Sequence, residues 1–276
     1  MKITGQRVVI LHNHIFKNAG TTIDWALEKS FGRTFVDHRD DHQMKQGTSY
    51  LGQYLIENRH IKALSSHHLP MPLPSLANAR VMMIMMLRHP IERVASVYNF
   101  EKNQLKSTTP GAIHARKLNL REYIQWRMQP EVGYTIRNFY THKLLPHKGR
   151  AKDAIGEQEM ATVMHSAVAI ELLGLVERFD ESMVLFEHCL RKFFPRIDLS
   201  YKIQNVGQET SGNRLERIES IRTEVGEDIF NLLLENNRRD LDLFASVESE
   251  IDRRITKVPD FNEKLISFRA RCKRYG

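Results

Sequence analysis

A strand–turn–helix pattern near the start of the chain constrains the fold more than any other feature. The apolar run Val8–Leu11 is typical of a buried strand, the turn that follows contains Lys17 and Gly20, and a helix begins at Thr21. In such a junction the backbone N–H groups and the positive end of the helix dipole point at one place, with a lysine beside it. We therefore predict an anion site for a phosphate or sulfate group, in a chain that handles a nucleotide.

This turn differs from a Walker A loop, in which the lysine stands at the helix entrance and is followed by serine or threonine. Here Lys17 comes three residues before Gly20, and the helix entrance, Gly20–Thr22, has no lysine. A second apolar run, Val81–Leu87, leads to Arg88 and not to the aspartate that would hold Mg²⁺ in a phosphoryl-transfer enzyme. Both differences weigh against a kinase-like enzyme, which is kept as one alternative.

The order of residues in Phe16–Thr22 resembles the Pro-Lys-x-Ala-Gly-Thr-Ser/Thr loop of the sulfotransferases, with Phe16 in place of the proline. In that family the loop binds the 5′-phosphosulfate end of 3′-phosphoadenosine 5′-phosphosulfate (PAPS). The resemblance implies that the donor is bound here by Lys17, Asn18, Ala19, Gly20, Thr21 and Thr22.

A second segment, Leu87–Tyr98, resembles the family's Leu-Arg-Asp-Pro-Val-Glu-Arg-x-x-Ser-x-Tyr signature, which holds the 3′-phosphate. By this resemblance Arg88 supplies a fork of donors and Ser96 a hydroxyl. His89 stands where the family has aspartate, and Arg93 is either a further positive charge or half of a surface ion pair. Arg214 ends a polar stretch, 203–214, that resembles the family's Asn-Val loop, so it is an additional candidate for phosphate contact.

Three further segments extend the resemblance to the glycan-modifying members: Tyr134–Leu144, Leu173–Met183 and Leu232–Phe244. The relatives that these segments resemble are the carbohydrate sulfotransferases, including the heparan sulfate O-sulfotransferases and bacterial counterparts. The resemblance implies PAPS as donor, PAP as product, no metal, and as acceptor a hydroxyl group of a carbohydrate or glycolipid.

Sulfuryl transfer needs a base for the acceptor hydroxyl, and histidine is the usual group near neutral pH. The segment Leu64–Met71 resembles the stretch that carries this base in the relatives. Alignment on Pro70 selects His68, and a slip of one residue selects His67. Lys17 would stabilise the negative charge that grows on the departing nucleotide. A solvated His-His turn is the alternative, because a chain with 13 histidines must hold many inert ones.

Two other polar segments invite a functional interpretation. Asp37–His42 offers carboxylates and imidazoles at short spacing, as metal sites do, but it lacks a recognisable regular element. We expect a solvated loop there, with contact to the acceptor as a second hypothesis. The basic tail Phe268–Tyr275 is expected to serve solubility, with binding to an anionic surface second.

The alternation of elements predicts an α/β fold: a P-loop NTPase-like parallel sheet flanked by helices, with a helical C-terminal region. We expect one domain over residues 1–276, with C-terminal helices at about 214–257 packed on it. Strands are expected near residues 7–12, 60–66, 80–87 and 170–177, and helices near residues 21–31, 91–104, 118–128, 134–145, 151–165 and 180–193.

The net charge of +8 suits a polyanionic donor, an acidic glycan or a nucleic acid, and cannot choose among them. The motifs favour the donor and a glycan, so we expect no nucleic-acid partner; a noncatalytic basic module that binds glycans or nucleic acid is the second alternative. Two cysteines fit a reducing compartment. Without a membrane span or signal peptide in the sequence, we expect a cytoplasmic bacterial enzyme, with a membrane-peripheral location as the alternative. The oligomeric state stays open.

Overall fold

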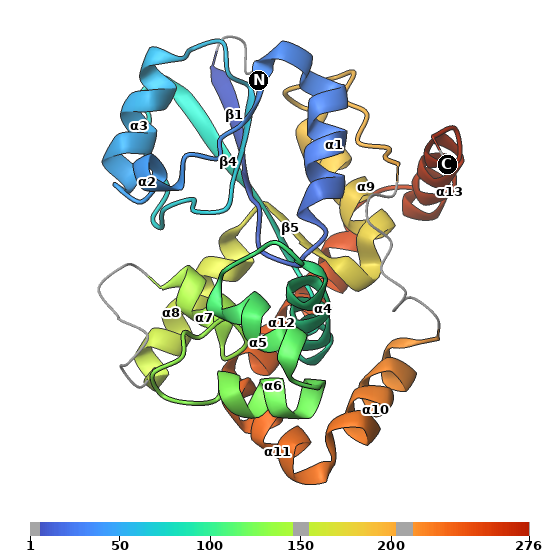
Figure 1. Cartoon of the computed structure of the whole chain (residues 1–276). Coiled ribbons are helices and arrows are strands. Elements are labelled where there is room, and N and C mark those ends of the chain that lie inside the picture. Colours follow the sequence, from blue (N-terminus) through green and yellow to red (C-terminus); the bar gives the residue numbers. More distant parts are fainter. Residues whose placement is uncertain (1–5, 146–154, 203–211, 276) are drawn as a thin grey trace. The chain divides into compact units, whose positions relative to one another are not determined.

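The computed structural model describes residues 6–145, 155–202 and 212–275 (Figure 1). Its contacts divide the chain into two compact units that alternate along the sequence. The first unit comprises Met1–Leu87, His165–Asn205 and Val247–Gly276, and the second comprises Arg88–Met164 and Val206–Ser246. That the whole chain is a single domain stays a prediction.

The first unit is built on a five-stranded sheet with the order β2-β3-β1-β4-β5. Every strand pair is parallel, and β1 lies between β3 and β4, with Ile10 opposite both Ala63 and Met82. The strands are β1 (Arg7–Asn13), β2 (Phe35–Asp37), β3 (Ala63–Ser66), β4 (Ala79–Leu87) and β5 (Leu172–Leu175). The predicted parallel sheet flanked by helices is therefore confirmed.

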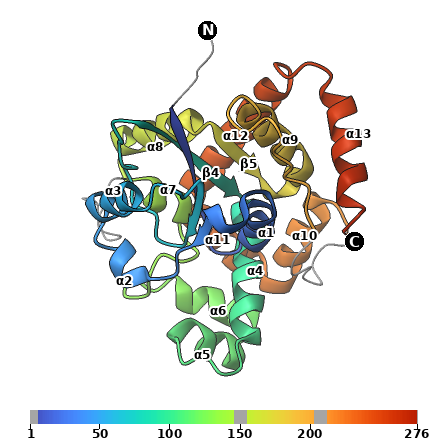
Figure 2. The same cartoon turned by 90° about the horizontal axis from the view of Figure 1, so that it is seen from above.

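Helices cover both faces of this sheet, which explains the unbroken apolar runs of β1 and β4. One face carries Val9, Leu11 and Leu64, which belong to one core cluster with residues of α2 (Asp41–Met44) and α3 (Thr48–Glu57). Figures 1 and 2 show these helices on one side of the sheet, with α1 (Gly20–Phe31) and α9 (Phe179–Leu190) on the other. Short 3-10 helices, Gly32–Thr34 and Val176–Arg178, follow α1 and β5.

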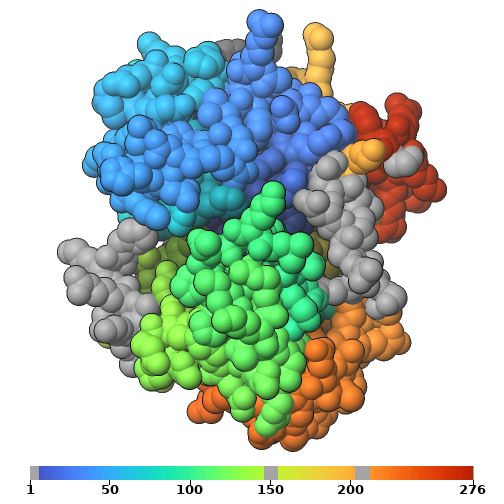
Figure 3. Space-filling view, in the orientation of Figure 1, coloured from blue at the N-terminus to red at the C-terminus, as the bar shows by residue number. Residues whose placement is uncertain are grey.

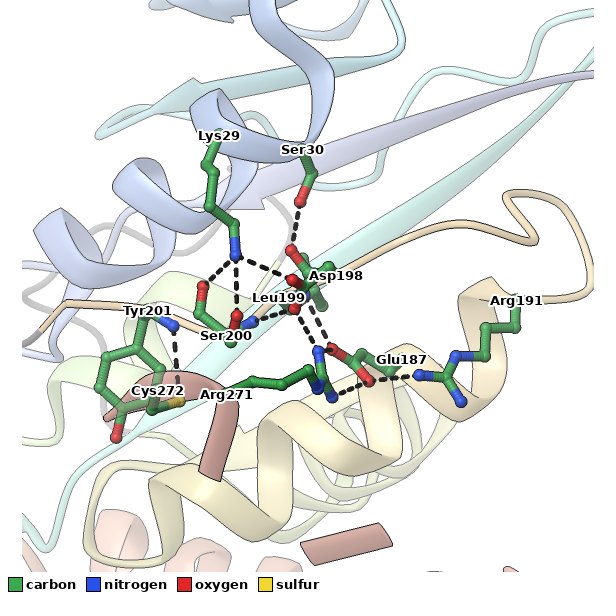
Figure 4. Close-up of polar contacts among 10 residues, drawn as sticks. All are labelled: Lys29, Ser30, Glu187, Arg191, Asp198, Leu199, Ser200, Tyr201, Arg271 and Cys272. Atoms are coloured by element: carbon green, nitrogen blue, oxygen red, sulfur yellow. Dashed lines mark hydrogen bonds and ion pairs between the residues drawn. The ribbon is translucent and has the colours of Figure 1, made fainter. Parts of the chain in front are cut away.

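The C-terminal helix α13 (Phe261–Cys272) packs on α9 in the same unit. Phe268 is fully buried, and Arg271 donates to both oxygens of the buried Glu187 carboxylate, at 2.9 and 2.8 Å. Figure 4 shows how Asp198 and Ser200 join this network to Lys29 at the end of α1. Within Phe268–Tyr275, Arg269 and Arg271 meet acids that lie far away in the sequence, while Lys273 and Arg274 are exposed, so the expected role in solubility stays a prediction.

The second unit is helical. Its helices are α4 (Pro90–Asn103), α5 (Pro110–Lys117), α6 (Leu120–Arg127), α7 (Phe139–Leu144), α10 (Arg214–Val225) and α11 (Glu227–Asn236), and the unit boundaries fall within α8 (Glu157–Ala169) and α12 (Arg238–Ile255). Arg121 of α6 forms two hydrogen bonds with Asp228 of α11, at 2.8 and 2.6 Å. Accordingly, the space-filling view shows the green surface of α5–α6 running directly into the orange surface of α10–α11 (Figure 3).

Most of the predicted elements are present near the predicted positions. The helix expected over 134–145 is shorter and starts at Phe139, and residues 151–154 of the next predicted helix lie outside the described residues. The predicted C-terminal helices form as α10, α11 and α12. Within the described ranges, no helix combines the length and the apolarity that a bilayer crossing requires.

Candidate active site

The loop between β1 and α1 adopts the backbone geometry of an anion cradle. Lys17 and Ala19 both have a left-handed conformation, with φ of 68° and 59°. Non-glycine residues adopt this conformation at a cost of about 1–2 kcal/mol each, so it persists where the surroundings impose it. Asn18, between them, is buried and donates from Nδ2 to the carbonyl of Met86 at 2.6 Å, which ties the loop to the end of β4.

The start of α1 suits an anionic ligand. Its first turn contains no acidic residue, and Ala19 is the residue before the helix. The first N–H groups of an α-helix have no acceptor within the helix, and they carry the positive end of its dipole. Thr21 is exposed and Thr22 is buried at this turn, while Lys17 is half-buried.

Gly20 stands where no side chain fits, because the ring of His14 fills the space. A Cβ atom at this position would lie 2.2 Å from Cδ2 and 2.4 Å from Nε2 of His14. Glycine is therefore required here by close approach, and the imidazole of His14 is part of the cradle's wall.

His14 belongs to a hydrogen-bonded group at the carboxyl end of β1. Nδ1 of His12 and Nδ1 of His14 each lie 2.7 Å from a different oxygen of Asp24, which projects from α1. Arg39 donates to the same carboxylate at 2.9 Å. Since a carboxylate only accepts, both imidazoles carry a proton on Nδ1.

The charges of this group follow from its contacts. Burial alone would raise the pKa of Asp24, but the hydrogen bonds from His12 and His14 outweigh it and hold the pKa well below its usual range. Burial lowers the pKa of His14, against the opposing effect of Asp24. Both effects describe an ionised carboxylate beside a neutral His14 imidazole.

His12, His14 and Asp24 also have the composition of a metal site, with ligand atoms within 4.8 Å of one another. Their separations of 2.7 Å are those of hydrogen bonds, however, and the Arg39 guanidinium already lies against the carboxylate. The arrangement is that of a proton-holding network.

His67 follows β3 and reaches the same group. Its Nδ1 lies 2.8 Å from the backbone carbonyl of His14, and its ring centroid lies 4.2 Å from that of His14. A carbonyl only accepts, so His67 carries its proton on Nδ1 and, when neutral, has its lone pair on Nε2. Burial lowers the pKa of His67, and His14 and Arg39 lower it further.

His68 points to a different partner. Its Nε2 lies 3.2 Å from Oδ2 of Asp41, and 37% of its side chain is exposed. The carboxylate holds a proton on Nε2, which leaves the lone pair of a neutral His68 on Nδ1. Of the two histidines that the sequence proposed, the structure joins His67 to the cradle, through His14.

In the second unit, the side chain of Tyr140 holds the backbone of Arg88. The Tyr140 hydroxyl accepts from the Arg88 N–H at 3.0 Å and donates to the Arg88 carbonyl at 2.9 Å. Asp240, which is buried, accepts from the backbone N–H groups of Tyr140 and Thr141 at 2.9 Å each. The two segments Tyr134–Leu144 and Leu232–Phe244, which both resemble motifs of the relatives, are therefore hydrogen-bonded to each other.

Arg214 lies near His89, and their neighbours Arg217 and Glu92 form a hydrogen bond although 125 residues separate them in the sequence. The His89 ring and the Arg214 guanidinium both contact Phe244, at 5.2 and 5.7 Å from its ring centroid. Burial lowers the pKa of His89 to about 4, and Arg214 lowers it as well. His89 is therefore neutral at pH 7, unlike the aspartate of the family signature.

The other residues of this signature are buried. Ser96 on α4 is buried, and Arg93 is only 2% exposed. The Arg93 guanidinium lies 3.9 Å from the centroid of the Phe139 ring and donates to the carbonyl of Thr135 at 2.7 Å. The alternative that Arg93 forms a surface ion pair is therefore wrong. Of the predicted loop 203–214, residues 203–211 lie outside the described residues.

The segment Asp37–His42 is more ordered than expected. Asp37 ends β2, Asp41 begins α2, and His38 is buried with its Nε2 2.9 Å from the Tyr50 hydroxyl. The expectation of a solvated loop holds for the exposed Asp37, Arg39, Asp40 and His42 but is wrong for His38 and for the regular elements at both ends. A strand of three residues is too short to give a periodic signal.

Asp24, His12 and His14 were not among the residues predicted from the sequence. Their signal is present: His12 lies on the strand and His14 two residues later, just past its end, and Asp24 lies one helical turn after Gly20. The sequence does not show on which side of the sheet α1 packs, and this decides whether Asp24 reaches the two histidines.

A model of the sulfotransferase family matches residues 2–245. The chain belongs to the sulfotransferase family. It is also 32% identical, over 251 residues, to a protein of Archaeoglobus fulgidus that is named only as uncharacterized; the match covers 87% of this chain and 96% of that protein. Membership of the family supports sulfuryl transfer as the activity of this sulfotransferase.

Proposed function

We propose that this sulfotransferase transfers the sulfuryl group of PAPS to a hydroxyl group of a carbohydrate or glycolipid, with PAP as the second product. The observation that carries the proposal is the cradle of Lys17–Thr22 with a histidine network on its wall. Family membership supports the transfer of a sulfuryl group, and the resemblance of the motifs supports the donor and the acceptor class.

The donor's 5′-phosphosulfate end is assigned to Lys17, Asn18, Ala19, Gly20, Thr21 and Thr22. Left-handed backbone at two positions and a helix start without acidic residues fit a doubly charged group. We assign the 3′-phosphate to Arg88, Ser96 and Arg214. The hydrogen bonds of Tyr140 to the Arg88 backbone and the contacts of Arg214 and His89 with Phe244 support this assignment.

We assign the base to His67 in preference to His68. A base must present a lone pair, and for a ring held at Nδ1 that lone pair is on Nε2. His67 is held at Nδ1 by the backbone carbonyl of His14, whose ring packs against Gly20 of the cradle, and its lowered pKa keeps it neutral at pH 7. His68 instead pairs with the Asp41 carboxylate on α2, and both side chains are partly exposed, as in an ordinary surface ion pair.

In the transfer, the acceptor hydroxyl gives its proton to Nε2 of His67 while its oxygen forms a bond to sulfur. The bond between sulfur and the bridging oxygen of the donor breaks, and its electron pair stays on the departing 5′-phosphate. Lys17 neutralises the charge that develops there. No metal is needed in this scheme, since Lys17 and the helix start supply the positive charge.

Incubation of the purified protein with ³⁵S-labelled PAPS and separate panels of sugars, glycolipids and polysaccharides tests the proposal. We expect label in one carbohydrate-containing class and release of PAP in equal amount. Glycan binding with no labelled product would instead favour a noncatalytic module, and magnesium-dependent ATP turnover would favour the kinase-like alternative.

A further inference from the structure

Asp24 accepts a hydrogen bond from each of two imidazoles, one on each carboxylate oxygen, and an amide has only one such oxygen. Its two oxygens face two Nδ1 atoms, each at 2.7 Å, and 13% of its side chain is exposed. The Arg39 guanidinium also lies 3.3 Å from Nδ1 of His14, but the carboxylate contact is shorter and decides which atom carries the proton. The Ser65 hydroxyl lies 3.0 Å from Nδ1 of His12, again farther than the carboxylate oxygen, so one acidic side chain makes the shortest contact to both histidines and orients both rings.

The effect of Asp24 extends to His67 through His14. The His14 ring packs against His67, and its backbone carbonyl accepts the Nδ1 proton of His67. The same ring also lies against Gly20. A change in the orientation of His14 would therefore reach the candidate base and the anion cradle together.

We propose that Asp24 is a positioning residue of the sulfotransferase site, which holds His12 and His14 with the proton on Nδ1 and, through His14, keeps Nε2 of His67 in place to take a proton from the acceptor. This inference rests on the proposed function for the role of His67. The tautomers that it assigns to His12 and His14 do not depend on any activity.

The variant Asp24→Asn separates positioning from bulk structure. An amide keeps the shape but offers one oxygen and one NH₂ group, so one of the two imidazoles must accept at Nδ1 and move its proton to Nε2. The variant also removes a negative charge near a site for anions, so positioning predicts undiminished affinity for PAP. A merely structural role predicts that affinity and turnover fall together.

Two measurements test the proposal. Long-range ¹H–¹⁵N spectra of the histidine rings, assigned with His12→Gln and His14→Gln, are expected to show protonated Nδ1 for both residues in the unaltered protein and inversion of one ring in Asp24→Asn. We expect kcat to fall about 10- to 100-fold, as for other hydrogen-bond partners that orient imidazoles, with the Kd for PAP unchanged or lower.

Asp37→Asn is the matched control, because Asp37 also pairs with Arg39, at 2.5 Å, and contacts neither imidazole. It removes the same charge and should leave both tautomers as they are. A proton on Nε2 of His14 in the unaltered protein, or unchanged tautomers in Asp24→Asn, overturns the proposal. Correct tautomers in a protein without sulfuryl transfer would instead refute the proposed function.

Discussion

At the scale of single residues, the site depends on contacts that allow little substitution. His14 uses its ring nitrogen for Asp24, its carbonyl for His67 and its ring edge for Gly20. The three contacts use different atoms of His14, so the residue can make all of them at once. This is why the loop combines a glycine, a histidine and left-handed residues within a few positions.

We predict that Gly20→Ala lowers both stability and turnover. The new Cβ would overlap a ring that Asp24 prevents from moving, and overpacking of this kind costs about 1–3 kcal/mol. Denaturant unfolding measures the change in stability. Gly133→Ala is the control, since its Cβ would meet nothing within 4 Å, and an equal loss in both variants would contradict the prediction.

The pH profile of kcat/KM reports the base. The pKa of His67 lies below its ordinary value of 6.5, mainly through burial; the His14 ring and Arg39 lower it further, while the hydrogen bond to the His14 carbonyl and the Asp41 carboxylate raise it. The neutral ring is the active form, so activity should be retained as the pH falls to 6.5 and be lost below it. Initial rates between about pH 4.5 and 8, roughly the range in which histidines titrate, measure this profile. A loss of activity that begins above pH 6.5 would argue against His67.

At the scale of elements, α13 and α9 are joined by one buried acid. Glu187 accepts from Arg271, from Arg191 at 2.9 Å and from the N–H of Leu199 at 2.8 Å. Ser200, which follows Leu199, accepts from Lys29 at the end of α1 through its carbonyl and its hydroxyl (Figure 4). The C-terminal helix therefore stabilises the far end of the helix whose start forms the cradle.

We predict that Glu187→Ala lowers the free energy of unfolding by about 2–3 kcal/mol, because it leaves cations and a buried N–H without their acceptor. Glu263→Ala, at an exposed position of α13, should change it by about 0.5 kcal/mol or less. Equal effects of the two substitutions in thermal unfolding would show that the network contributes little.

The elements themselves were predictable where apolar periodicity is strong. Val8–Leu11 and Val81–Leu87 predicted β1 and β4, and Pro90 predicted the start of α4. The structure adds β2, which is too short to show a pattern, and α13, whose Arg271 is explained only by Glu187 and Asp198. Pairings between distant residues set these elements, and a single sequence does not display them.

The candidate site was predictable to the same depth. The loop signatures named Lys17 and Arg88, and alignment on Pro70 favoured His68 with His67 as the alternative, since both lie in one turn after β3. The choice follows from a backbone carbonyl of His14, and no side-chain pattern records the direction of a carbonyl.

At the scale of the whole molecule, the proposed contacts with the donor divide into two tasks. Lys17→Ala should lower kcat more than it weakens binding of PAP, because the charge that Lys17 neutralises grows only as the donor bond breaks. Arg88→Ala should mainly weaken binding of PAP, since the 3′-phosphate keeps its charge throughout. Calorimetric titration with PAP and steady-state kinetics measure both; a loss of affinity in Lys17→Ala that accounts for all of its effect would contradict this division.

The most direct measurement is the single-turnover transfer of ³⁵S from bound PAPS to the identified acceptor, compared for His67→Ala and His68→Ala at equal occupancy of PAPS. Loss of a general base costs about 10²- to 10⁴-fold in rate. We predict a loss of this size for His67→Ala and a far smaller one for His68→Ala. The reverse order, or full transfer by both variants, would contradict the assignment of His67 as the base of this sulfotransferase.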